Sequence, residues 1–150
     1  MRNPVTDDIE TDDIEDGPFP LTVLVTAVWS FFEGEQFSDP AEFNRRVAEY
    51  HTEVGGEDTW DPDEVVLSAP GIRIAYFGVE SPDDEEYTEF TAELRSDDVT
   101  QFTAGELLLK LNNTVAPHLK GMDHCYFEGL FLTDEPPVDG VPVYEMMQGS

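Results

Sequence analysis

The stretch YTEFTAELR, residues Tyr87–Arg95, alternates between apolar and polar side chains. Successive side chains of a β-strand point to opposite faces, so alternation places one set inward and the other in water. The set expected to face inward is Thr88, Phe90, Ala92 and Leu94. Such a pattern is typical of an antiparallel sheet that packs one face on a core and exposes the other. This stretch therefore predicts a half-solvated strand.

Further strands are expected on both sides of this stretch. A short turn at Ser81–Glu86 separates it from the strand before it, and Pro70–Gly71 joins that strand to an earlier one, which predicts antiparallel pairing in this part of the sheet. Leu21–Ala27 could run on to Phe32, and a helix over Leu21–Phe32 is the alternative. The other predicted strands are Glu64–Ala69, Ile72–Val79, Cys125–Thr133 with an interruption at Gly129, and Val141–Met147.

A first helix is predicted to begin at Asp39. Asp39 suits the N-cap position, Pro40 the first helical position and Glu42 the third. Apolar residues then recur on one helix face, and Gly55–Gly56 should end the helix. That face is made by Phe43, Val47, Tyr50 and Val54.

A second helix is predicted to begin at Thr103. Glu106 follows three residues later, which completes the pattern of a capping box. Pro117 lies in the last turn and should distort or end the helix. The apolar face consists of Leu107, Leu108, Leu111, Val115 and Leu119.

This order of elements predicts an α+β fold. We expect a two-layer domain with a mostly antiparallel sheet of about six strands and two helices on one face. Residues 1–18 are expected to form an acidic disordered tail, because TDDIE at Thr6–Glu10 is repeated at once at Thr11–Glu15. Residues 19–150 are expected to form one domain.

The charge of the chain restricts its partners. Seven Lys and Arg face 34 Asp and Glu, for a formal net charge of −27. Proteins bind nucleic acid and anionic membranes through Lys and Arg, so we expect neither direct nucleic-acid binding nor membrane binding. A basic protein is the favoured partner. The longest uncharged run, Gly17–Phe32, is shorter than the roughly 20 residues of a membrane span, and we expect a cytoplasmic protein.

No metal, cofactor or catalytic site is predicted. His118, His124 and Cys125 lie close in sequence, but their spacing matches no zinc pattern, and adjacent strand residues point to opposite faces. The acids near Cys125 disfavour the negatively charged thiolate that a nucleophile needs. With 34 acids, paired carboxylates carry no information, and no phosphate-binding or hydrolase motif is present, so nothing points to an enzyme.

Two groups of acids are the candidate partner-binding residues. The first recurs every four residues around the alternating strand, and the second crowds the loop at residues 57–63. The groups are Glu85, Glu89 and Glu93, and Asp58, Asp61 and Asp63. The loop lacks the register and the glycine of an EF-hand, so only adventitious divalent-cation binding is expected there. The aromatic runs at Trp29–Phe32 and Tyr126–Phe127 predict either core or a protein-binding hot spot.

Two accounts of the acidity remain open. In one, the protein is a non-enzymatic interaction module that binds a basic partner, as inhibitors, immunity proteins and nucleic-acid mimics do. In the other, the chain is a small domain of a salt-in halophile whose acidity is solvent adaptation, with an unassigned enzymatic or ligand-binding role. The spread of acids over every segment suits the second account, and the glutamates of the alternating strand suit the first.

Overall fold

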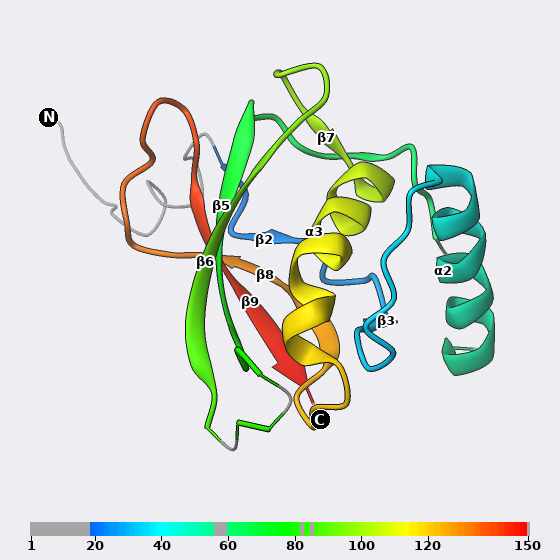
Figure 1. Ribbon diagram of the computed structural model, residues 1–150. Coiled ribbons are helices and arrows are strands. Elements are labelled where there is room, and N and C mark those ends of the chain that lie inside the picture. The colour runs from blue at the N-terminus through cyan, green and yellow to red at the C-terminus, as the bar shows by residue number, and fades with distance from the viewer. Residues whose placement is uncertain (1–18, 56–59, 82, 85, 150) are drawn as a thin grey trace, which may run out of the picture.

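The computed structural model describes residues 19–55, 60–81, 83–84 and 86–149 (Figure 1). The predicted tail, residues 1–18, lies outside the described residues, as do Asp58 and Glu85. Most of the buried apolar side chains of the described residues form one core cluster, whose largest fully buried members are Tyr144, Phe31, Phe43 and Phe102.

The main sheet is mixed and has six strands, as the sequence predicts. Five strands follow the order β2-β8-β9-β5-β6, and β3 also pairs with β8. The β5–β9 pair is parallel, and the other pairs of this sheet are antiparallel. The strands are β2 (Thr22–Val23), β3 (Trp29–Ser30), β5 (Gly71–Gly78), β6 (Thr88–Arg95), β8 (Tyr126–Leu132) and β9 (Val143–Gly149).

A second, smaller sheet corrects one prediction. The strand expected at Glu64–Ala69 is β4 (Val65–Leu67), which pairs with β7 (Phe102–Thr103) rather than with β5. The turn at Pro70 therefore carries the chain from one sheet to the other. Since β7 leads directly into the second helix, the small sheet joins the start of that helix to the chain before β5.

Both helices form where the sequence predicts them. They are α2 (Pro40–Gly55) and α3 (Ala104–Leu119). In Figure 1, α3 lies between α2 and the β5–β6 pair, and the contacts agree: α3 touches β5 and β6, and α2 touches α3 and β3. The α+β class is thus confirmed, and the placement of both helices on one face of the sheet stays a prediction.

Side-chain caps explain where the helices begin. Asp39 Oδ1 accepts a hydrogen bond from the Ala41 N–H at 3.1 Å, and Thr103 Oγ1 accepts one from the Glu106 N–H at 3.3 Å. The predicted apolar face of α3 is fully buried, whereas Val54 at the end of α2 is 60% exposed, so its predicted burial is wrong. The helix α3 ends two residues after Pro117.

The alternation along β6 is confirmed for most of its length. Phe90 and Ala92 are half-buried and Leu94 is buried, whereas Glu89 and Glu93 are exposed. Thr88 is exposed, contrary to expectation, because it pairs with Gly78 at the last residue of β5.

Within the predicted strand Leu21–Ala27 only β2 forms, and β3 lies in the stretch up to Phe32 onto which that strand could run. A turn separates them, in which Leu24 has a φ of 61° and its carbonyl accepts a hydrogen bond from the Ala27 N–H. The cause is a bulge in β8, whose register shifts between Phe127 and Leu130 around Gly129, as the sequence interruption predicts. Both short strands pair with β8 on either side of this bulge, and Val25 packs against Gly129.

Candidate binding groove

The acids predicted to bind a partner do not share one site. Glu89 and Glu93 lie exposed on β6, and Glu93 is ion-paired with Arg73 at 3.2 Å and with Arg95. Asp61 accepts a hydrogen bond from the Asp63 N–H at 3.2 Å, so its carboxylate supports a turn before β4. None of the described hollows brings the acids of β6 and the acids of this loop together.

A hollow of about 390 Å³ lies elsewhere, between β3, residues 32–37, α2 and the first residue of β8. We call it the aromatic groove. Its aromatic lining residues are Trp29, Phe32, Phe37, Tyr50 and Tyr126. The two aromatic runs that the sequence singled out meet here, because β3 pairs with β8 and places Ser30 opposite Tyr126.

Two asparagines of α3 hold the floor of the groove. Asn112 is 1% exposed and accepts a hydrogen bond from the Trp29 indole N–H at 3.0 Å. Its amide donates to the Glu35 carbonyl at 2.8 Å. Asn113 accepts from the Phe37 N–H and donates to the Phe37 carbonyl. Because buried amides with satisfied partners rigidify a structure, residues 35–37 are held in place before any ligand arrives.

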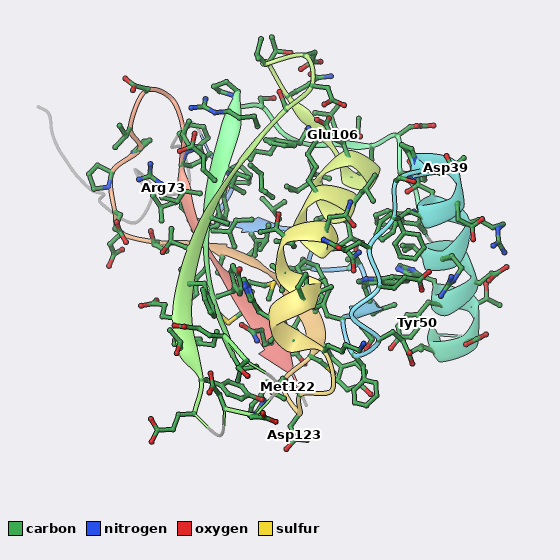
Figure 2. All side chains as sticks on the ribbon, viewed as in Figure 1. Asp39, Tyr50, Arg73, Glu106, Met122 and Asp123 are labelled. Carbon is green, nitrogen blue, oxygen red and sulfur yellow. The ribbon has the colours of Figure 1, made fainter. Side chains whose placement is uncertain are left out.

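The aromatic wall runs from buried to exposed. Trp29 contacts Tyr50 edge to face, with ring centroids 5.7 Å apart, and Tyr50 projects from the side of α2 that faces β3 (Figure 2). Burial raises the pKa of the Tyr50 phenol, and the nearby Tyr126, Cys125 and Glu53 raise it further. Tyr126 and Phe32 are 42% and 50% exposed. The groove therefore offers apolar rings to solvent.

Carboxylates outnumber cations in the groove. Its charged lining residues are Glu33, Glu35, Glu49, Glu53 and Arg46. The Arg46 guanidinium lies 3.2 Å from the Glu35 carboxylate and 5.4 Å from the centroid of the Phe37 ring. Glu49 is paired with Arg45 at 2.6 Å, outside the lining. Among the described residues, Glu33 and Glu53 form no ion pair, so these two carboxylates leave an uncompensated negative charge in the groove.

A second hollow adjoins the aromatic groove. It has a volume of about 350 Å³ and is lined by Phe32 and Tyr126 together with Met122, Asp123, His124 and Cys125. Met122 and Asp123 lie in the loop that follows α3 (Figure 2). Phe32 and Tyr126 belong to both hollows, so we call these two side chains the aromatic ridge.

His118 lies apart from His124 and Cys125, which both line the second hollow. The His118 ring stacks on Phe90 with centroids 4.2 Å apart, and its Nδ1 lies 2.8 Å from the Tyr76 hydroxyl. His124 contacts Tyr87 edge to face, and Cys125 is a buried free thiol. Within the part of the chain that the structure describes, no group of three or more His, Cys, Asp or Glu side chains is arranged to hold a metal ion.

Sequence reasoning missed much of this groove. It named the aromatic runs but neither the glutamates that accompany them nor the two asparagines of α3. Asn112 carried a usable signal, since it is a polar residue beside Leu111 on the apolar face of a predicted helix.

No helix among the described residues combines the length and the apolar character needed to cross a bilayer. A scan against protein-family models finds no matching family, and searches of curated proteins and of solved structures find no match. The function must therefore be argued from the groove itself.

Proposed function

We propose that the protein is an interaction module that binds a basic protein, and that the aromatic groove receives cationic groups of this partner. The observation that carries the proposal is the combination of exposed aromatic rings with four carboxylates and a single arginine in one hollow. Aromatic faces and carboxylates both attract cations, and the two attractions act together when they line the same site.

The rest of the molecule supports this assignment. A net charge of −27 attracts a basic partner over long range and raises its rate of encounter. A uniformly acidic surface would bind every basic protein weakly. A groove with rings and a preorganised floor adds the short-range contacts that select one orientation.

Solvent adaptation to high salt is the competing account of the acidity. It predicts that every carboxylate contributes equally to the attraction of a basic probe. The groove account predicts that two carboxylates, Glu33 and Glu53, contribute more than others of equal exposure. Neutralisation of matched pairs of acids therefore separates the two accounts.

The test measures binding of a fluorescent peptide of alternating lysine and glycine by anisotropy at moderate salt. We expect Glu33→Gln/Glu53→Gln to weaken binding about fivefold to tenfold, since each ion pair contributes up to about 1 kcal/mol. The control, Asp134→Asn/Glu135→Gln, removes the same charge from the exposed connection between β8 and β9. Equal losses in the two variants would contradict the groove.

A third variant tests the acids of β6 that the sequence predicts to bind a partner. Glu89→Gln/Glu93→Gln removes two carboxylates from β6, one of which is already paired with arginine. We expect binding of the same peptide to fall no further than in the control. If this variant loses more affinity for the peptide than the groove variant does, the binding site lies on β6 rather than in the groove.

A further inference from the structure

We infer that the partner presents an extended basic segment that crosses the aromatic ridge and places a cationic side chain in each hollow. This inference rests on the proposed function and deepens it by naming the form of the ligand. It starts from the two hollows, whose linings share the Phe32 and Tyr126 side chains.

The size of the hollows argues for a chain rather than a small cation. Their volumes are about 390 and 350 Å³, whereas a water molecule, similar in size to an ammonium group, takes up roughly 30 Å³. A single ammonium group would leave most of either hollow filled with solvent. A peptide carries its cations on long apolar stems, which pack on aromatic rings while the charged ends reach carboxylates.

The aromatic ridge is held by backbone that is already ordered. The Phe32 N–H donates to Ser30 Oγ at 3.2 Å, and the Phe32 carbonyl accepts from the Gly121 N–H at 2.9 Å. Tyr126 pairs with Ser30 on one side and with Gly149 on the other. A ligand therefore orders only two side chains when it crosses the ridge, which lowers the entropic cost of binding.

Carboxylates line both hollows. Glu33 and Glu53 line the aromatic groove, and Asp123 lines the second hollow. Within the described ranges Asp123 forms no ion pair, as is also true of the two glutamates. Each hollow can thus neutralise one cation, and the rings between them cover the stem that connects the two.

The experiment compares two probes of equal positive charge by isothermal titration of the full chain. One is the lysine–glycine peptide, and the other is spermine. The ridge variant is Phe32→Ala/Tyr126→Ala. Its control is Phe77→Ala/Phe131→Ala, which removes two rings that are 42% and 39% exposed and that line neither hollow. Melting temperatures establish that both variants are folded.

We expect the wild type to bind the peptide more tightly than spermine. The ridge variant should lose about tenfold in affinity for the peptide, because the stem that crosses the ridge loses the two rings on which it packs. Its affinity for spermine should change less than twofold, and the control variant should bind both probes as the wild type does. The variant Asp123→Asn removes the carboxylate of the second hollow. If this variant binds the peptide more weakly but binds spermine as the wild type does, the inference gains independent support.

Two results would overturn the inference. If the wild type binds spermine as tightly as the peptide, free charge is sufficient and no segment crosses the ridge. The second such result is that the ridge variant binds the peptide as tightly as the wild type, whereas Glu33→Gln/Glu53→Gln binds it more weakly. That second result would leave the proposed function standing and remove only the crossing segment.

Discussion

At the scale of single residues, Arg46 shows how a cation sits in the aromatic groove. Its guanidinium lies over the Phe37 ring and beside the Glu35 carboxylate, the combination proposed for the partner's side chains. It also adds the one positive charge of the lining. The positive charge of Arg46 therefore repels an incoming cation.

Replacement of this arginine should strengthen the binding of basic ligands. In Arg46→Gln the Glu35 carboxylate is released and the repulsion of an incoming cation is lost, so we expect the affinity for the lysine–glycine peptide to rise about threefold to tenfold. The free energy of unfolding should fall by less than about 1 kcal/mol, since the ion pair is partly exposed. Anisotropy titration and urea unfolding measure the two effects.

Arg73→Gln is a closely matched control for this prediction. The side chains of Arg73 and Arg46 are 37% and 36% exposed, and each pairs with one glutamate at 3.2 Å. Both substitutions change the net charge equally, but Arg73 lies on β5, outside the groove. The same gain in both variants would mean that only net charge matters.

The sequence predicts some residue environments better than others. It places Leu94 inside, because strand alternation depends only on local spacing. It fails at Val54 and Thr88, which have the right spacing but lie where their element ends and nothing covers them. It could not predict the Arg46–Glu35 pair, since this contact depends on how residues 32–37 fold back onto α2.

At the scale of elements, the bulge in β8 organises the chain around the groove. Gly129 has a φ of 110°, and a Cβ built there would meet Val25 Cγ1 at 2.8 Å. Only glycine suits this conformation at low cost. The bulge lets β2 and β3 pair with the same strand on either side of a turn, which brings Trp29 and Ser30 beside Tyr126.

A side chain at this position should destabilise the fold. In Gly129→Ala we expect the free energy of unfolding to fall by more than about 1 kcal/mol, because strained backbone and a close contact with Val25 act together. Urea unfolding measures the loss, and anisotropy shows whether peptide binding weakens with it.

Gly55→Ala serves as the reference for this substitution. Gly55 ends α2, and no atom lies within 4 Å of a Cβ built there. A helical glycine is less favourable than alanine, so this change should leave stability unchanged or raise it by up to about 1 kcal/mol. If both variants lose the same free energy of unfolding, the loss in Gly129→Ala does not come from strain at the bulge.

Elements with local signals were predictable. Both helices carry an N-terminal cap and an apolar face within or next to their own residues, so the residue at which each begins follows from the sequence. The separation of β2 from β3 was not predictable, because both strands pair with a bulged strand that lies about one hundred residues later in the chain. The sequence showed the interruption at Gly129 without showing which strands lie beside it.

At the scale of the whole molecule, the α+β class was predictable and the topology was not. Alternation and capping indicate which segments are strands and helices. They do not indicate that β9 lies between β5 and β8, or that β4 leaves the main sheet to pair with β7. The groove combines residues of β3, α2 and β8, so it depends on the same long-range arrangement.

The excess of carboxylates should make stability depend on salt. Residues 21–150 alone hold 27 acids and six bases, and the repulsion among them opposes the compact state. We expect the melting temperature to rise steeply between low salt and molar KCl, where the screening length falls to roughly 3 Å. Differential scanning calorimetry over a KCl series measures it.

Sucrose at equal osmolality provides the comparison for this series. It stabilises folded proteins through exclusion from their surface and screens no charge. A melting temperature that stays flat in KCl, or that rises equally in sucrose, would show that the charges of the folded state do not repel one another appreciably.

The parallel β5–β9 pair determines the order in which the sheet can assemble. The hairpins β5–β6 and β8–β9 each join neighbours in sequence, and they can form early as local units. Their union requires Arg73 to meet Val143, nearly half the chain away, so the slow step of folding should be the docking of two preformed hairpins. Until that encounter the part of the core that lies between the two hairpins remains open to water.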